Sequence, residues 1–207
     1  MSYLEIKKRL PVNVNILAVS KGFKSSDIEY VHSLGQVDFG ESKVQEAFSK
    51  SIFQDKKNLN WHFIGRIQTN KIRKIVENFD FIHSVDSYQK LLKISKVSTE
   101  IKKIPKVMIQ IKLANDPEKA GMSIKELIDN WDNIKTMSGI KVEGLMTINP
   151  KGLSSNQNLE LFKKCRLIAD SLQLPECSMG MSNDWQEAVE AGSTWLRLGS
   201  LIFGKRN

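Results

Sequence analysis

Short apolar segments alternate with longer polar segments along the whole chain. Several of the short segments are continuous apolar runs, which indicates strands buried on both faces in a parallel sheet. The predicted strands are Ile16–Ser20, Val37–Phe39, Trp61–Ile64, Phe81–Ser84, Val107–Ile111, Val142–Met146, Cys177–Met179 and Trp195–Leu198. The polar segments between them have the periodicity of amphipathic helices. The predicted helices are Ser25–Leu34, Ser42–Phe53, Gln68–Val76, Tyr88–Thr99, Ile124–Met137, Asn156–Ser171 and Asn183–Ala191.

Eight strands, most of them followed by a helix, predict an α/β protein with a single (β/α)8 TIM barrel. The chain has 207 residues, close to the lower limit of about 200 for this fold. We therefore expect one domain over residues 1–207, without a large insertion. An open, doubly wound sheet is the alternative fold.

Composition is typical of a globular protein, with 41% hydrophobic and 26% charged residues. The apolar runs are too short to span a membrane, and charges occupy the N-terminal segment where a signal peptide needs apolar residues. Two cysteines, Cys165 and Cys177, form neither a disulfide framework nor a metal site. These features predict a cytoplasmic protein whose cysteines are small buried side chains.

The net charge of +8 raises the question of a nucleic-acid partner. The basic residues are spread along the chain, and no nucleic-acid-binding motif accompanies them. Attraction of small anionic molecules is sufficient to explain this charge. We expect no nucleic-acid partner and no membrane association.

Lys21 directly follows the first predicted strand, and barrel enzymes carry their chemistry at the carboxyl ends of strands. Burial lowers the pKa of an amine, and a neutral amine can form a Schiff base with an aldehyde. The alternative is an ordinary surface lysine. His62 is expected to pack within its strand, and His83 lies near the end of the fourth strand. No spacing suggests a metal site.

Two segments near the end of the chain predict a phosphate site. Ser182 precedes the predicted helix Asn183–Ala191 closely, and Gly199 and Ser200 follow the last strand. A helix start and a small-residue turn both offer backbone N–H groups to an anion. Each alone is compatible with a simple helix cap or turn, but barrels often bind phosphate after their last two strands.

The ordered set of motifs resembles the YggS/PROSC family of pyridoxal-phosphate-binding homeostasis proteins, which is related to the N-terminal barrel of alanine racemase (fold type III). The matching stretches are Ala18–Lys21, Phe39–Glu41, Val44–Glu46, Trp61–Gly65, Gln68–Lys71, His83–Asp86, Lys119–Gly121, Gly144–Met146, Ser178–Ser182, Ala191–Thr194, Arg197–Ser200 and Ile202–Gly204. The resemblance implies that Lys21 forms a Schiff base with pyridoxal 5'-phosphate. It also implies that Arg197 faces the pyridine nitrogen, while Ser182, Gly199 and Ser200 hold the phosphate. One departure is Ser42-Lys43, where the family has Asn-Tyr.

The resemblance predicts a protein of intracellular pyridoxal 5'-phosphate homeostasis, with little or no catalysis and no catalytic residue. It is expected to be a monomer that exchanges the cofactor with apo enzymes. The alternative is a racemase-like enzyme, which needs a base on each face of the substrate carbon. The three tyrosines, Tyr3, Tyr30 and Tyr88, lie away from the predicted strand ends. This placement favours the binding protein.

Overall fold

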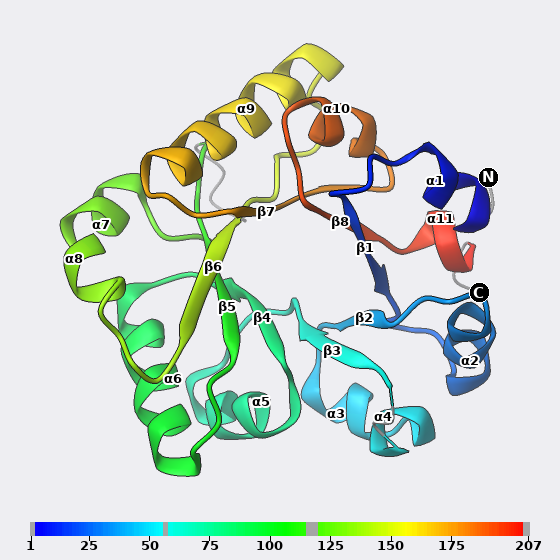
Figure 1. Ribbon diagram of the computed structural model, residues 1–207, viewed down its shortest axis with the longest axis horizontal. Coiled ribbons are helices and arrows are strands. Elements are labelled where there is room, and N and C mark those ends of the chain that lie inside the picture. Colours follow the sequence, from blue (N-terminus) through cyan, green and yellow to red (C-terminus); the bar gives the residue numbers. More distant parts are fainter. Residues whose placement is uncertain (1–2, 56–57, 115–119, 205–207) are drawn as a thin grey trace.

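Eight parallel strands close into a barrel at the centre of the molecule, as Figure 1 shows. The computed structural model describes residues 3–55, 58–114 and 120–204, so Lys119 of the predicted motif lies outside the described residues. The strands are β1 (Asn15–Val19), β2 (Asp38–Glu41), β3 (Asn60–Phe63), β4 (Phe81–Val85), β5 (Lys106–Gln110), β6 (Lys141–Met146), β7 (Glu176–Met181) and β8 (Trp195–Leu198). β8 pairs with β1, so the predicted barrel is confirmed and the open sheet is wrong.

Helices surround the barrel and cover the outer face of its strands (Figure 1). They are α1 (Tyr3–Arg9), α2 (Ser25–Ser33), α3 (Val44–Phe48), α4 (Ser51–Asp55), the 3-10 helix η1 (Thr69–Lys71), α5 (Ile72–Asn78), α6 (Tyr88–Ile101), α7 (Ile124–Asp129), α8 (Trp131–Ile134), α9 (Ser155–Ser171), α10 (Trp185–Glu190) and α11 (Ser200–Phe203).

Two predicted helices are each divided in the structure. The predicted helix over 42–53 is replaced by α3 and α4, and the hydroxyl of Ser49 between them donates to the Glu46 carbonyl. The segment 124–137 contains α7 and α8, and the Asn130 side chain bonds the Glu126 carbonyl at the break. Such side-chain bonds to a preceding carbonyl compete with continuation of the helix.

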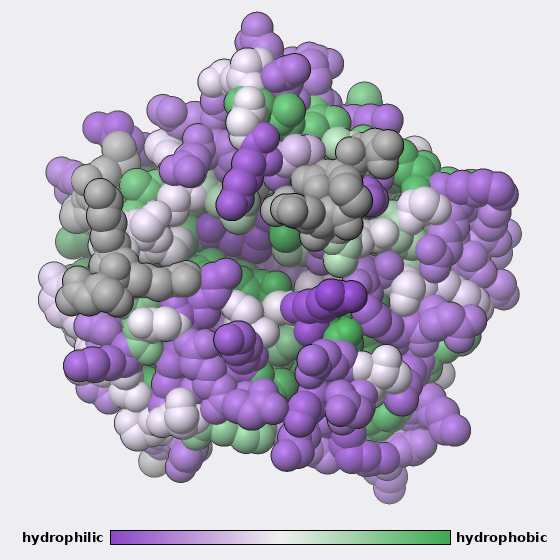
Figure 2. Space-filling view, turned by 180° about the vertical axis from the view of Figure 1, so that it is seen from behind, coloured by the Kyte–Doolittle hydropathy of each residue, from purple (hydrophilic) through white to green (hydrophobic). Residues whose placement is uncertain are grey.

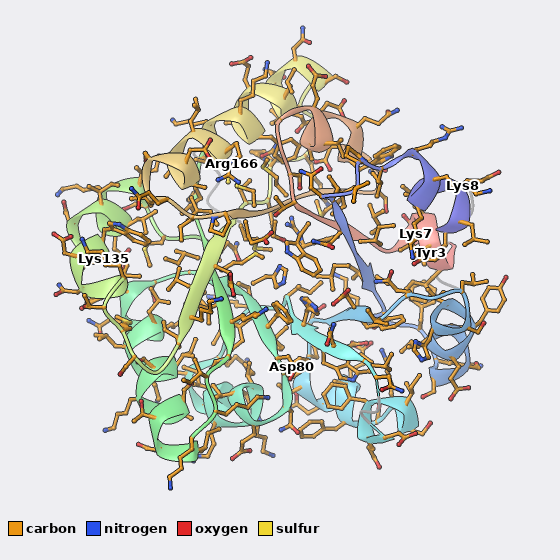
Figure 3. The ribbon with its side chains drawn as sticks, in the orientation of Figure 1. Tyr3, Lys7, Lys8, Asp80, Lys135 and Arg166 are labelled. Atoms are coloured by element: carbon orange, nitrogen blue, oxygen red, sulfur yellow. The ribbon has the colours of Figure 1, made fainter. Side chains whose placement is uncertain are left out.

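The sequence pattern missed α1 and α11. Figure 3 shows α1 at the edge of the molecule, with Tyr3, Lys7 and Lys8 labelled on it. Tyr3 of α1 is buried, and its hydroxyl donates to the side-chain oxygen of Gln36 at 3.0 Å. Phe203 of α11 stacks on Phe23 with ring centroids 4.7 Å apart. Helices this short have no measurable periodicity, and tertiary contacts decide their formation.

The main hydrophobic core fills the space between strands and helices. Trp61 of β3 lies 4.7 Å from Phe53 of α4 and 5.9 Å from Phe39 of β2, measured between ring centroids. Phe79, directly after α5, lies 5.3 Å from Phe53. Burial of these rings against the helices explains why the strands contain so few exposed polar residues.

The interior of the barrel is partly polar, unlike this outer core. Four buried residues form its apolar part: Leu17, Met108, Met146 and Trp195. Successive residues of a strand point to opposite faces, and the inward positions also carry Asp38, His62, His83, Ser178 and Arg197, which are joined by hydrogen bonds. A hydrogen-bonded polar chain inside a small barrel replaces part of the usual aliphatic filling.

Cys165 and Cys177 are free thiols without solvent exposure, as predicted for small buried side chains. The hydrogen bond to Cys177, together with burial, raises the pKa of the Cys165 thiol well above its ordinary value. Among the helices that the structure describes, none is long and apolar enough to cross a membrane.

Candidate functional site

A cavity of about 680 Å³ opens at the carboxyl ends of the strands. All five site residues predicted from the sequence line it, and they come from opposite ends of the chain: Lys21, Ser182, Arg197, Gly199 and Ser200. Figure 2, which views the molecule from the side opposite to Figure 1, shows a hollow near the centre of the face, bordered by both polar and apolar side chains. Closure of the barrel brings these residues together because β8 pairs with β1.

Strand alternation directs Lys21 toward this cavity. Leu17 belongs to the interior cluster and Val19 lines the cavity. Lys21, two residues further on, continues the inward series and is half-buried. Ser20 points the other way, and its hydroxyl donates to the Glu41 carboxylate at 2.6 Å.

An ionic cluster outside the barrel wall holds the segment around Lys21. The Lys50 ammonium donates to the Ser20 carbonyl at 2.8 Å and contacts the Glu41 carboxylate. The backbone N–H of Gly22 donates to the Glu46 carboxylate, which Lys50 also contacts at 3.4 Å. The residues on both sides of Lys21 are therefore fixed by what we call the Lys50 cluster: Ser20, Glu41, Glu46 and Lys50.

Sequence reasoning did not assign a role to Lys50. Burial raises the pKa of Glu41, while hydrogen bonds from Lys50 and Ser20 oppose that rise. The second carboxylate oxygen of Glu41 is buried without a hydrogen-bond partner. The strand pattern is the sequence feature that could have pointed to Lys50. It places Glu41 facing outward at the end of β2, and a glutamate buried under the helices needs a cation beside it.

The departure at Ser42-Lys43 lies away from the cavity. Neither residue is among those that line it, and Lys43 is exposed. A Cβ on Gly65 would lie 1.9 Å from the Ser42 carbonyl oxygen, so close packing of the backbone requires glycine there. The local difference from the family therefore affects the rim of the barrel rather than the cavity walls.

Arg197 reaches the cavity from β8 and is only 4% exposed. One terminal nitrogen, Nη1, donates to the carbonyl and the hydroxyl of Ser178, at 2.6 and 3.0 Å. The other, Nη2, donates to the Thr147 carbonyl at 2.9 Å. Burial lowers the pKa of Arg197 to about 10, so the guanidinium is charged at neutral pH.

The turns predicted to bind phosphate are both present, with different local structure. Asp184, not Ser182, is the residue that precedes α10, and its carboxylate accepts the Met181 N–H at 2.6 Å instead of capping the helix. Gly199 and Ser200 form the start of α11 rather than a simple turn. N–H groups in the first turn of a helix lack intrahelical acceptors, so those of Ser200 and Leu201 are available to a ligand.

One wall of the cavity is formed by residues other than the five predicted site residues. The loop after β6 contributes Asn149, Pro150, Lys151, Gly152 and Leu153. Lys151 gives the cavity a second amine, which lies on an exposed loop rather than at a strand end. Met181 lines the cavity and is 38% exposed, whereas Met179 is fully buried in the core.

The histidines behave partly as predicted. His62 is fully buried and stacks on Phe81 at 4.2 Å, which confirms its packed position. His83 is also buried and is absent from the cavity lining, but Ser178 connects it to Arg197. Within the described residues, no group of His, Cys, Asp and Glu could hold a metal ion.

The closed barrel and its cavity define a class of (β/α)8 proteins with a lysine after the first strand and an arginine on the last. The chain belongs to the family described as the alanine racemase N-terminal domain, which it matches over residues 2–207. The predicted membership in the YggS/PROSC group within that family is confirmed by the relatives that follow.

Two curated relatives carry the name pyridoxal phosphate homeostasis protein. The protein from Synechocystis sp. is 42% identical over 211 residues, covering 99% of this chain and 97% of the relative. The protein from Pseudomonas aeruginosa is 34% identical over 201 residues, covering 96% and 87%. The match therefore extends over nearly the full length of both relatives.

Solved structures agree with this relationship. PipY from Synechococcus elongatus with pyridoxal phosphate bound superposes with a TM-score of 0.93 at 38% identity, covering 97% of each chain. Alanine racemase from Clostridium difficile has a TM-score of 0.81 at 15% identity, and the match covers 96% of this chain but 54% of the racemase. The second likeness concerns the barrel fold alone.

Proposed function

We propose that this protein binds pyridoxal 5'-phosphate in the barrel mouth and acts in the homeostasis of that cofactor. The observation that carries the proposal is the convergence of Lys21, Arg197 and the two small-residue turns on one cavity. Its volume of about 680 Å³ is within the range of about 300–1,000 Å³ usual for small-molecule sites. The relatives named above are homeostasis proteins, and one related structure contains pyridoxal phosphate.

Lys21 is the residue that would hold the ligand covalently. Condensation of its amine with the ligand aldehyde forms a carbon–nitrogen double bond and releases one water. The Lys50 cluster supports this role because it fixes the backbone on both sides of Lys21. Ser182, Gly199 and Ser200 would bind the phosphate through hydroxyl and backbone N–H groups.

Arg197 is suited to face the pyridine nitrogen. Three of its five N–H groups are used within the protein, so donors remain for an acceptor in the cavity. When bound, pyridoxal phosphate supplies an electron sink, which is strongest when a carboxylate keeps its ring nitrogen protonated. A guanidinium cannot accept that proton, so Arg197 favours the weak sink of a neutral ring.

The second candidate function is a racemase-like enzyme. Such an enzyme needs a base opposite Lys21. None of the three tyrosines lines the described cavity: Tyr3 is buried in α1, Tyr30 on α2 is 66% exposed, and Tyr88 begins α6. The placement of the tyrosines supports the binding function, with no catalytic residue assigned.

We further infer that residues 1–207 act as one cofactor-binding unit and that the protein is a monomer which exchanges the cofactor with apo enzymes. A cytoplasmic location is supported by the two buried, unpaired cysteines, because reducing compartments keep thiols free.

The proposal is tested by reduction of the purified protein with borohydride after incubation with pyridoxal 5'-phosphate. We expect a stable pyridoxyl group on the peptide that contains Lys21, and none after Lys21→Ala. Lys151→Ala is the matched control, because Lys151 is the other amine in the cavity. A pyridoxyl group on Lys151 instead of Lys21 would contradict the assignment of the Schiff base to Lys21. A pyridoxyl group that still forms in Lys21→Ala would contradict it as well.

A further inference from the structure

A continuous hydrogen-bonded chain crosses the barrel interior from the cavity to the opposite end of the strands. Arg197 contacts the Ser178 hydroxyl at 3.0 Å, and that hydroxyl lies 2.9 Å from Nδ1 of His83. Nε2 of His83 lies 2.8 Å from Nδ1 of His62, whose Nε2 lies 3.1 Å from an Asp38 carboxylate oxygen. The chain thus joins side chains on β8, β7, β4, β3 and β2.

The interior links of this chain are sealed from solvent. Ser178, His83 and His62 have no exposed surface, whereas Asp38 at the far end is 17% exposed. Burial lowers the pKa of His62 and lowers that of His83 well below its ordinary value. Both imidazoles are therefore neutral at pH 7, and each has one N–H donor and one nitrogen acceptor.

All hydrogen bonds of the chain run in one direction, because the groups at its two ends have fixed donor and acceptor roles. The Asp38 carboxylate only accepts, so Nε2 of His62 carries the proton and its Nδ1 accepts from His83. Nδ1 of His83 then lacks a proton and accepts from the Ser178 hydroxyl. That hydroxyl has its own oxygen free to accept from Arg197, which can only donate. A cation and an anion thus stand at opposite ends of one polarised chain.

We propose that the Asp38–His62–His83–Ser178 chain is a positioning device that orients Arg197 toward the pyridine nitrogen of the ligand. This inference rests on the proposed function. Ser178 occupies both N–H groups of Nη1, and the Thr147 carbonyl occupies one of Nη2. Two of these acceptors are backbone carbonyls, and the third is the Ser178 hydroxyl of the chain. The uniform direction of the chain keeps that hydroxyl oxygen an acceptor, so it holds one Nη1 donor and leaves the unused guanidinium donors for the cavity.

A purely structural role makes a different prediction. The two imidazoles also pack against aromatic rings, since His62 stacks on Phe81 and both lie within 6 Å of Trp195, at 5.0 and 5.9 Å. If packing were their whole contribution, breaking the chain would lower stability and affect every ligand equally. A positioning role instead affects ligands according to whether they contain the ring nitrogen.

The test compares pyridoxal 5'-phosphate with its 1-deaza analogue, in which a carbon replaces the ring nitrogen. Wild type should bind pyridoxal 5'-phosphate more tightly than the analogue, and Ser178→Ala should reduce that preference by about tenfold, as expected when a hydrogen bond to a charged group is misaligned. Ser193→Ala is the matched control. The Ser193 hydroxyl is also buried, and it donates only to backbone carbonyls of β7 and β8. It should leave the preference unchanged.

Nitrogen NMR of the apo protein provides a readout that is independent of ligand. At pH 7, both His62 and His83 should be neutral with the proton on Nε2. Asp38→Asn replaces the acceptor with an amide that can also donate, so both rings should lose this single tautomer. This substitution acts at the more exposed end of the chain, which makes it a second test if Ser178→Ala does not fold.

The outcomes separate the two proposals. If wild type binds neither ligand, the proposed function fails and the positioning role fails with it. If wild type prefers pyridoxal 5'-phosphate but Ser178→Ala and Ser193→Ala retain the same preference, the positioning role alone is overturned. A proton on Nδ1 of either histidine in wild type would also overturn it.

Discussion

Lys50 and Glu41 form an ion pair on the outer side of the barrel wall, and their side chains are only 6% and 0% exposed. Lys50 also bonds the carbonyl of Ser20, the residue before Lys21. Taking two charges out of water is costly, and this cost is balanced only while both partners are present. The pair thus links the stability of the fold to the placement of the proposed covalent lysine.

Lys50→Met should destabilise the protein by about 3–5 kcal/mol, because it leaves the Glu41 carboxylate buried without its cation. Urea unfolding at pH 7 measures the change. Lys125→Met is the control, since the Lys125–Asp129 pair is exposed at 83% and 53% and should contribute less than about 0.5 kcal/mol. The double variant Lys50→Met with Glu41→Gln should recover part of the loss. An effect of Lys50→Met no larger than that of the control would contradict this account.

Lys21→Ala should abolish covalent attachment of pyridoxal 5'-phosphate while the fold remains intact. Lys21 is half-buried at the cavity edge, where substitutions usually change stability by less than about 0.5 kcal/mol. Weaker, non-covalent binding should persist through the phosphate contacts. Thermal unfolding without ligand and equilibrium dialysis with it measure the two effects, and a large fall in melting temperature would mark Lys21 as a structural residue.

Phosphate contacts should dominate affinity, so pyridoxal should bind far more weakly than its phosphate ester. Hydrogen bonds to a charged group contribute roughly 1.5–3 kcal/mol each, and the site offers several donors from Ser182, Gly199 and Ser200. Isothermal titration of both ligands measures the difference. Equal dissociation constants would remove the argument for a phosphate site.

Gly199→Ala should weaken binding of pyridoxal 5'-phosphate without a large loss of stability. A Cβ at Gly199 would meet its nearest atom, the Val19 carbonyl oxygen, at 3.6 Å, which is an ordinary contact. Gly180→Ala is the contrasting variant, because Gly180 has a φ of +88° and its Cβ would lie 2.4 Å from Ala188. That variant should unfold at lower temperature. Unimpaired binding by folded Gly199→Ala would place the phosphate elsewhere.

Stability should fall as the pH decreases below about 6.5, the ordinary pKa of histidine. Burial lowers the pKa of His62 and His83 in the folded state, so the unfolded chain binds more protons in this range. The stabilisation is complete above pH 6.5 and is lost toward lower pH, by up to about 1.4 kcal/mol per pH unit for each histidine. Neighbouring charges also affect these pKa values. The pKa of His62 is raised by Asp38 and Asp80 and lowered by Lys106. The pKa of His83 is lowered by His62 and Arg197.

Urea unfolding of wild type and His83→Gln at pH 7.5 and 5.5 measures this dependence. The variant should lose less stability than wild type over that interval, because it retains only one buried imidazole. His32→Gln provides the control, since His32 lies on the half-buried surface of α2. Equal pH dependence in wild type and His83→Gln would show that burial does not lower the pKa of His83 in the folded protein.

Amino-acid racemisation and transamination should not proceed at enzymatic rates. Arg197 cannot keep the ligand ring protonated, and no tyrosine lines the described cavity to act as a second base. Slow exchange of the substrate α-proton by Lys21 alone is still expected, because exchange on one face needs one base. Chiral chromatography and deuterium incorporation with several L-amino acids measure both. Turnover of about 1–10³ per second that is lost in Lys21→Ala would establish an enzyme.

The sequence was sufficient to predict the barrel and the ends of its strands. Trp195–Leu198 matches β8 as predicted, and the other strands differ by one or two residues at their ends. Lys21 and Gly199 were also recognisable, because each directly follows a predicted strand. The role of Arg197, which lies within the last predicted strand, was implied only by the family resemblance. The helices were less regular than their patterns, since local side-chain bonds at Ser49 and Asn130 divide two of them.

Lys50, His62 and His83 show why the rest of the site required the structure. Lys50 belongs to the same polar segment as the exposed Lys43, and nothing in the local sequence distinguishes the two lysines. His62 and His83 lie 21 residues apart, and their hydrogen bond depends on the pairing register of β3 and β4. Strand alternation places both on one face, but only the closed barrel shows that Ser178 lies against them.

The sequence by itself determined the repeated strand–helix pattern, the position of the amine and the small residues of the two turns. Apolar periodicity and strand-end chemistry are local properties, so they can be read along the chain. The tertiary structure decided which side chains meet: the Lys50 cluster around Lys21 and the chain from Asp38 to Arg197. Such contacts join residues distant in sequence, and their energies depend on burial and on a hydrogen-bond geometry that exists only after the barrel has closed.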